Sequence, residues 1–133
     1  MFSQNKNSGP LILVVEDVEE TRDGIEKLLH VDGYRVEPAR TLHEATLKAI
    51  LHPPNLVLMC PAGPTTQVIQ SAYQIRQEAS LSEYIPIVIF CVEEIVEGQE
   101  VAIGHNIYLT HLDNFNQLRV LLLRLLSANP LVS

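Results

Sequence analysis

Strand-like and helix-like segments alternate five times along this chain, and no other feature of the sequence constrains the fold as strongly. The strand-like segments are short apolar runs such as LILVV, whereas the helix-like segments repeat apolar residues every three or four positions. The strand-like segments cover residues 11–15, 34–38, 55–60, 84–92 and 106–110, and the helix-like segments cover residues 18–33, 41–50, 65–79, 93–104 and 114–127. Because parallel strands are usually joined by a helical crossover, this order predicts a parallel sheet with helices on both faces.

The predicted fold class is therefore α/β. Five strand–helix units of this size most economically form a flavodoxin-like (βα)5 three-layer sandwich, in which a parallel five-stranded sheet has the strand order 2-1-3-4-5. The 133 residues are enough for one domain and short for two. We expect a disordered N-terminal arm at residues 1–9, one folded domain at residues 10–127 and a C-terminal tail at residues 128–133.

Charge and composition exclude several classes of partner. The chain has 9 Lys and Arg residues against 16 Asp and Glu residues, whereas a nucleic-acid-binding protein needs a basic face. No apolar run is long enough to span a membrane, and the polar start MFSQNKNSGP lacks the apolar core of a signal peptide. Two cysteines do not make the disulfide framework of a secreted protein. We expect a cytoplasmic protein that binds neither nucleic acid nor membrane.

Chemically distinctive residues follow the predicted strands at the points where ligands gather in open α/β sheets. Glu16 and Asp17 follow the first strand, Cys60 ends the third, Cys91 stands near the end of the fourth, and His111 follows the fifth. The carboxyl ends of parallel strands meet at one edge of the sheet, so we expect these five residues to lie close together.

These segments resemble, in order, the receiver domain of two-component response regulators across residues 10–127. LILVVED resembles the first strand and acidic pair of that family, and PPNLVLMC resembles its "P-D-L-I-L-L-D" strand, with Pro64 four residues after Cys60. IPIVIFCV resembles the fourth strand, which normally ends in Thr or Ser followed by Ala. NIYLTHL resembles the fifth strand, with Tyr108 at the aromatic switch position. The resemblance implies that Glu16 and Asp17 occupy the positions of the metal-binding acids.

The resemblance also implies a pocket that has lost its chemistry. Receivers phosphorylate an Asp with the help of Mg²⁺, a hydroxyl and a Lys, and here those three protein positions hold Cys60, Cys91 and His111. A thiol replaces the carboxylate nucleophile and a hard oxygen ligand, and a neutral imidazole replaces a fixed cation. Val92 stands where a small residue lets the switch region close. We therefore expect a non-enzymatic pseudo-receiver in signal transduction that acts by protein–protein contact and without phosphorylation.

The pocket leaves other interpretations open. Cys60, Cys91 and His111 are ligand types for zinc or copper, so a ligand-, soft-metal- or redox-sensing domain is the alternative function, although close-spaced ligand pairs are absent. A Cys60–Cys91 disulfide is within reach of neighbouring strand ends, but two separate thiols are favoured in a reducing compartment. Glu16 and Asp17 either bind Mg²⁺ weakly or form only a solvated acidic cluster. No firmly bound cofactor is expected.

The last helix indicates a partner surface, because it is more apolar than one covered stripe requires. In receivers, partners and dimers dock on the face of helix four, strand five and helix five. We expect signalling proteins, or a second copy in a homodimer, to bind this face, beside an acidic fourth helix at residues 93–104. The predicted contact residues share this last helix: Leu118, Leu121, Leu122 and Leu125. Tyr108 is expected either to switch or simply to pack.

Overall fold

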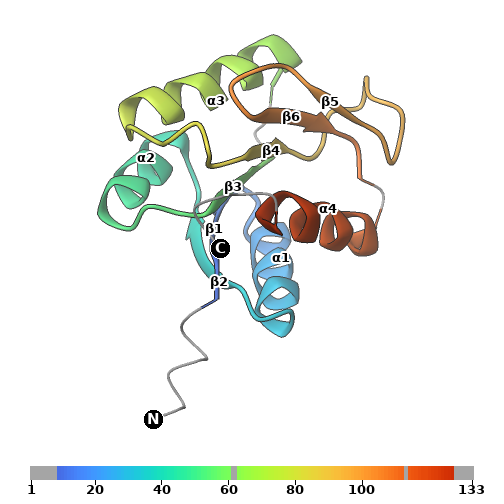
Figure 1. Ribbon diagram of the computed structural model, residues 1–133, viewed down its shortest axis with the longest axis horizontal. Coiled ribbons are helices and arrows are strands. Elements are labelled where there is room, and N and C mark those ends of the chain that lie inside the picture. Colours follow the sequence, from blue (N-terminus) through green and yellow to red (C-terminus); the bar gives the residue numbers. More distant parts are fainter. Residues whose placement is uncertain (1–8, 61–62, 113, 128–133) are drawn as a thin grey trace.

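A mixed six-stranded sheet forms the centre of the protein (Figure 1). The computed structural model describes residues 9–60, 63–112 and 114–127, so that the predicted arm and tail lie outside the described residues except for Gly9. The strands are β1 (Leu11–Val15), β2 (Arg35–Ala39), β3 (Leu56–Met59), β4 (Ile87–Ile89), β5 (Glu100–Ala102) and β6 (Ile107–Thr110). Their order in the sheet is β2-β1-β3-β4-β6-β5.

The five strands other than β5 are parallel and confirm the predicted order 2-1-3-4-5, with β6 as the fifth of them. Every residue of β1, β3 and β4 is buried, because helices cover both faces of the sheet. This double burial explains why these strands appear in the sequence as continuous apolar runs. Pro38 lies in β2, at the edge of the sheet, where a missing backbone donor is tolerated.

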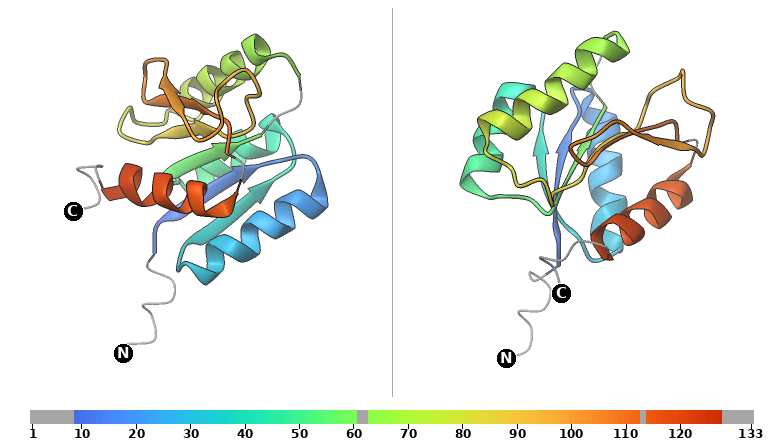
Figure 2. Two further views of the ribbon diagram at one scale, coloured as in Figure 1. Left: turned by 90° about the vertical axis from the view of Figure 1, so that its right-hand side faces the viewer. Right: turned by 45° about the horizontal axis from the view of Figure 1, so that its top comes forward.

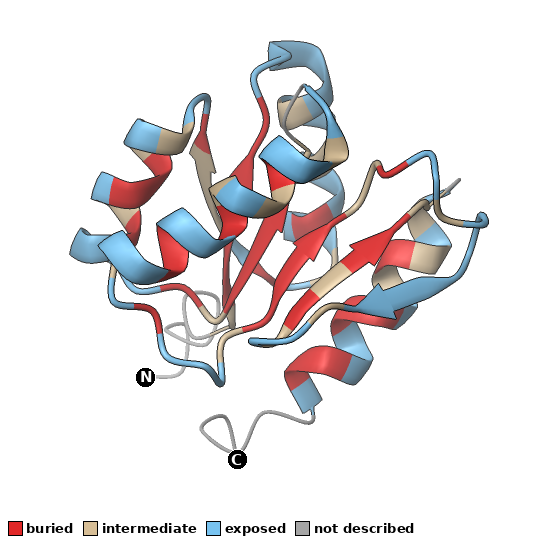
Figure 3. Ribbon diagram, turned by 90° about the horizontal axis from the view of Figure 1, so that it is seen from above, coloured by how far each residue is buried: buried red, intermediate tan, exposed pale blue. Residues whose placement is uncertain are grey.

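Four described helices form the outer layers (Figure 2). One apolar cluster joins one face of the sheet to α1 (Glu19–Val31) and α4 (Phe115–Ser127). A second cluster joins the opposite face to α2 (Leu42–Leu51) and α3 (Thr65–Glu78). In Figure 3 the buried residues of each helix face the sheet and the exposed ones face outward. The three-layer sandwich is therefore as predicted.

The predicted fourth helix at residues 93–104 is wrong. These residues form a turn-rich loop and then β5, which pairs antiparallel with β6 through Glu100↔Thr110 and Ala102↔Tyr108. Gly98 interrupts the segment at φ 83°, a left-handed conformation that does not occur within a helix. Its N–H donates to the carbonyl of His111 over 2.8 Å, so pairing with β6 satisfies this donor instead of a helical bond. Alternating apolar residues at Val101 and Ile103 are the strand-like signal within this segment.

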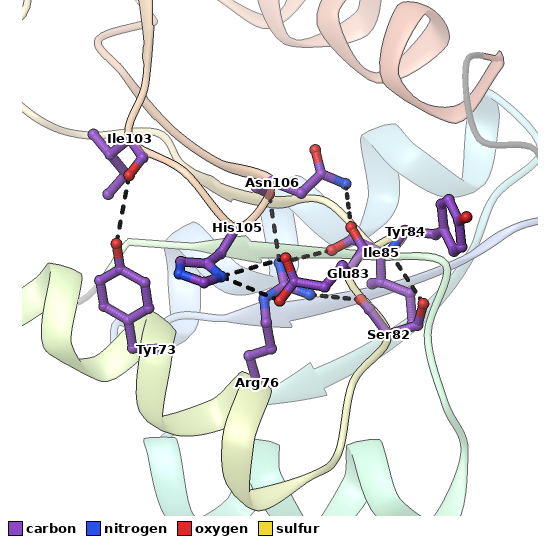
Figure 4. A network of polar contacts seen from close by, with 9 residues as sticks. All are labelled: Tyr73, Arg76, Ser82, Glu83, Tyr84, Ile85, Ile103, His105 and Asn106. Carbon is purple, nitrogen blue, oxygen red and sulfur yellow. Dashed lines mark hydrogen bonds and ion pairs between the residues drawn. The ribbon is translucent and has the colours of Figure 1, made fainter.

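A buried arginine holds together the opposite edge of the sheet, where β4 and β6 begin (Figure 4). Arg76 on α3 is only 6% exposed. Its guanidinium donates to the carbonyl oxygens of Ser82 at 2.6 Å, Ile85 at 2.9 Å and Asn106 at 3.5 Å. Burial lowers the pKa of Arg76, whereas the nearby Glu83 carboxylate raises it. One side chain thus connects α3 to the segments that lead into both strands.

Candidate functional site

A disulfide bond joins Cys60 and Cys91 at the carboxyl edge of the sheet. The two Cα atoms lie 5.6 Å apart, within the usual range of about 4.4–6.8 Å for a disulfide. Two separate thiols had been favoured from the sequence, and the structure corrects this prediction. The two residues follow the neighbouring strands β3 and β4, whose last paired residues are Met59 and Ile89. The register places Phe90 opposite Cys60, and Cys91, one residue further along the chain, forms the bond.

The other predicted pocket residues lie along the same edge, in the order of the strands. The N–H of Cys60 donates to the carbonyl of Val15 at the end of β1, directly before Glu16. On the other side, Cys91 forms an isolated antiparallel bridge with His111. The edge therefore runs from Glu16 through the disulfide to His111, as the order of the strands requires.

The two acids at the start of this row differ in environment. Glu16 is 4% exposed and accepts a hydrogen bond from the N–H of Val18 at 3.1 Å, whereas Asp17 is exposed. Burial is the main cause of a raised Glu16 pKa, since the charged form loses hydration, and the Val18 N–H acts in the opposite direction. Of the two side chains only Asp17 is exposed to water, so the pair does not form two equal solvated acids.

Glu16→Gln should therefore make the protein more stable at neutral pH. A carboxyl whose pKa is raised in the folded state stabilises that state below its unfolded pKa, near 4.5, and this contribution is lost as the pH rises through the folded pKa. The stability gain of the variant should be absent near pH 4 and should grow toward pH 7. Urea unfolding at a series of pH values measures this difference.

Glu44→Gln is the matched control with the opposite sign. The Glu44 carboxylate accepts from the N–H of Arg40 at 2.6 Å, and this bond is the main cause of its lowered pKa. Its contribution is present above the unfolded pKa near 4.5 and is lost as the pH falls through the folded pKa. Glu44→Gln should therefore lose stability at pH 7 but not at pH 3. If Glu16→Gln loses stability at pH 7 in the same way, burial does not control Glu16.

His111 lies at the far end of the row, half-buried. Its Nδ1 is 3.3 Å from the carbonyl oxygen of Ile95, so the ring is directed at the loop before β5. Within the described residues, no group of three or more His, Cys, Asp and Glu side chains is arranged to hold a metal ion. In the disulfide form, neither sulfur is available as a thiolate ligand, which metals bound by cysteine require.

Two cavities open at this edge. One of about 480 Å³ is lined by Cys91 together with residues from the start of α3 and from the loop after β4, including Thr65 and Glu94. The hydroxyl of Thr65 donates to the Glu94 carboxylate at 2.9 Å across this cavity. The other, of about 240 Å³, is lined by Glu16 and Asp17 together with Arg40. Cys91 is thus reached from open space on one side, and the acids lie on the other.

Tyr108 on β6, the predicted switch residue, is half-buried against the cluster that contains α1 and α4. Its hydroxyl donates to the Asn106 side-chain oxygen at 2.7 Å. The same strand carries Thr110, which is fully buried and whose hydroxyl donates to the carbonyl of Ile89 at 3.1 Å. In this structure the Tyr108 ring is therefore packed and its hydroxyl is hydrogen-bonded.

The predicted interface leucines lie in the core, whereas an interface requires exposed residues, so this prediction is wrong. All four belong to the cluster that attaches α4 to the sheet, and Leu122 is 0% exposed. The apolar residues that α4 leaves in water are Val120, at 64% exposure, and Leu123, at 56%. The first of these borders a groove of about 510 Å³ between α4 and β5, which the ion pair of Arg124 with Glu100 spans.

Two features of this edge and its neighbouring face were missed from the sequence. The disulfide is one of these features: the sequence places both cysteines at the ends of neighbouring strands, but the register puts Phe90 opposite Cys60, and the expected reducing compartment favours two thiols. The edge strand β5 was missed because four glutamates near helical spacing obscured the alternation of Val101 and Ile103.

No protein-family model matches the chain, and no curated protein matches it. None of the described helices is both long and apolar enough to cross a membrane. Solved structures do match over most of their length. A response regulator receiver domain protein from Clostridium thermocellum is 14% identical, with a TM-score of 0.72 over 93% of this chain and 99% of that chain.

Two further solved structures carry the same indication. TrrA, a response regulator protein from Thermotoga maritima solved with Mg²⁺ and BeF, is 20% identical with a TM-score of 0.67 over 87% of this chain and 98% of that chain. TrrA in complex with the histidine kinase ThkA gives a TM-score of 0.69 at 20% identity, over 87% of this chain and 97% of that chain. The chain therefore has a receiver-like α/β fold, in which the described residues form four helices and a mixed six-stranded sheet.

Proposed function

We propose that this protein is a pseudo-receiver that works in two-component signalling by protein–protein contact and without phosphorylation. The receiver-like fold supports a signalling role, because receiver domains are typically non-catalytic signalling modules. The observation that carries the proposal is the residue at the end of β3. By the resemblance of the strands this position corresponds to the phosphorylated Asp of a receiver, and here it is Cys60, whose sulfur is bonded to Cys91. A sulfur held in a disulfide is not a thiolate, so it cannot act as the nucleophile that attacks a phosphoryl group.

The proposal predicts that acetyl phosphate and Mg²⁺ will not phosphorylate the protein. Incorporation of radiolabelled phosphate should stay at the background level, both with the disulfide intact and after reduction. A conventional receiver domain treated in parallel provides the positive control. Magnesium-dependent labelling that is lost in Cys60→Ser would contradict phosphorylation independence.

The partner surface that the structure supports best is the α4–β5 groove, defined by Glu100, Leu112, Val120, Leu121 and Arg124. Its three apolar side chains stand beside one acidic and one basic side chain and beside the amides of Gln99, Asn114, Asn116 and Gln117, and such a mixed lining is typical of the polar part of a protein interface. A receiver-like protein has been solved bound to a histidine kinase, so a signalling protein of a two-component pathway is the proposed class of partner. Whether the partner is instead a second copy is decided by sedimentation of the purified chain.

Val120→Glu should weaken partner binding by about tenfold or more, since it introduces a charge beside the apolar side chains of the groove. The control is Leu47→Glu, which changes an exposed leucine on α2, on the opposite face of the sheet. Immobilised wild type and variants would be compared for recovery of a purified candidate kinase and of untagged wild-type chain. Equal recovery on both variants would remove the groove from consideration, provided that their thermal unfolding is unchanged.

A further inference from the structure

The Cys60–Cys91 disulfide lies at the surface and not in the core. Both residues are half-buried, and neither belongs to the two apolar clusters that hold the layers together. Cys91 lines the open cavity of about 480 Å³, which gives an external thiolate a route to its sulfur. Exposed disulfides are usually the labile, redox-active ones, whereas buried structural ones are shielded from exchange.

Cys91 is also the second residue of the segment between β4 and β5, here called the β4–β5 loop (residues 90–99). Beyond Cys91 the loop is attached by Val92 and Ile95, which pack in the apolar cluster under α2 and α3, and by a short series of backbone contacts near β6. The N–H of Val92 donates to the carbonyl of Thr110 at 2.9 Å, and the N–H of Gly98 donates to His111 at 2.8 Å. The ladder between β3 and β4 ends at Met59 and Ile89, so the disulfide is the covalent link that fixes where the loop leaves the sheet.

The charges of the loop favour its release once that link is broken. Glu93, Glu94 and Glu97 lie on the loop, and Glu100 follows at the start of β5. Glu94 is held by Thr65 and Glu100 by Arg124, but both contacts are exposed and contribute little. Mutual repulsion of the four carboxylates opposes their compact arrangement. The loop is therefore the described segment whose order depends most directly on the Cys60–Cys91 bond.

We propose that Cys60 and Cys91 form a reversible thiol–disulfide switch, that its reductant is a protein dithiol of the thioredoxin class, and that its state sets the order of the β4–β5 loop and β5. The redox reaction stands independently of the proposed signalling function; only its use as an input to the α4–β5 groove rests on that function. A two-electron change at the strand ends then takes the place that a covalent phosphate would occupy.

The exchange proceeds in two steps. A thiolate of the reductant attacks the Cys91 sulfur, which forms a mixed disulfide, breaks the Cys60–Cys91 bond and leaves Cys60 as a thiolate that takes up a proton. The second thiol of the reductant loses its proton and attacks the reductant sulfur that is bonded to Cys91. This step releases Cys91 as a thiolate, which takes up a proton. Two electrons and two protons pass to the protein, and the reductant becomes a disulfide. A disulfide oxidant such as glutathione disulfide reverses the reaction by the same exchange.

The first test measures reduction of the folded chain by thioredoxin with its reductase and NADPH, with free thiols trapped by a maleimide of known mass. Dithiothreitol is also added to folded chain and to chain unfolded in urea. The ratio of the two reduction rates measures how accessible the disulfide is in the folded protein. Folded protein should be reduced by dithiothreitol at a rate within about a hundredfold of the unfolded chain, and thioredoxin should reduce it too. A larger gap, or no reaction with thioredoxin, would mean a structural bond and would overturn the switch.

The second test uses a protease that cleaves after glutamate, because the β4–β5 loop supplies its own sites. Reduction should raise cleavage after Glu93, Glu94 and Glu97 about tenfold or more beyond any rise after Glu20 and Glu26 in α1, which report the loss of global stability. Cys60→Ser/Cys91→Ser should behave like reduced wild type and should not respond to reductant. Equal acceleration at loop and helix sites would show that the bond only stabilises the whole domain, and no acceleration would show that the loop is independent of it; either result overturns the proposal. Neither test involves phosphate or a partner, so failure here leaves the proposed signalling function to its own experiments.

Discussion

Cys60→Ser/Cys91→Ser should lower the free energy of unfolding by about 3 to 4 kcal/mol, the largest effect expected of any change described here. The bond joins residues 31 apart in sequence, and closing a loop of that length removes conformational entropy from the unfolded chain. For a domain of this size, such a loss is a large fraction of the total stability. Urea unfolding monitored by circular dichroism gives the difference directly.

Reduced wild-type protein is the control for the serine variant. Both lack the cross-link, so their midpoints should agree, and dithiothreitol should shift the wild type but not the variant. The free energies of unfolding of the reduced wild type and of the serine variant are each compared with that of the oxidised wild type. If both are lower by less than about 1 kcal/mol, the denatured chain gains little conformational entropy when the bond is lost, which contradicts the loop-entropy account.

Arg76→Met should lower the free energy of unfolding by about 2 kcal/mol, the second largest effect. Methionine fills a similar apolar volume, but it donates to none of the three carbonyls that the guanidinium contacts in Figure 4. Removing a buried cation recovers its desolvation cost, which is why the loss is smaller than the sum of three charge-assisted bonds. Arg76→Ala, which also leaves a cavity, should lose more.

Gln77→Met is the control for the arginine variant, since it makes a similar change at the neighbouring, exposed position of α3. It should change stability by no more than about 0.5 kcal/mol. The two methionine variants are compared by thermal and urea unfolding. If they are indistinguishable, the buried guanidinium does not organise the start of β4 and β6.

The parallel sheet could be predicted because its strands are buried on both faces, which leaves uninterrupted apolar runs that helices do not show at that length. The first turn of α2 is equally clear from its residue types, because threonine is a preferred helix cap and the Thr41 hydroxyl accepts from the N–H of Glu44 at 3.1 Å. The segment at residues 93–104 was not, because its propensity is weak and pairing with β6 decides its structure. Whether a segment forms a strand depends on the strand it pairs with, and the local sequence does not identify a partner that is distant along the chain.

The site was predicted in part for a similar reason. Strand order brought Glu16, Cys60, Cys91 and His111 to one edge, but the compartment argument could not decide between two thiols and a disulfide. On α4, apolar residues occupy most sides of the helix, so the sequence did not identify the stripe that faces the sheet. The structure selects Leu118, Leu122 and their neighbours for the core and leaves Val120 outside.

The strand β5 closes the sheet with an unshared row of backbone amides and carbonyls along its outer side. Such a border invites addition of a further strand from another molecule, which is the usual route to aggregation. β5 is only 3 residues long and carries the charge of Glu100, and both features oppose such pairing. A substitution that both lengthened β5 and neutralised Glu100 would therefore turn a protected border into a seed for fibrous assembly.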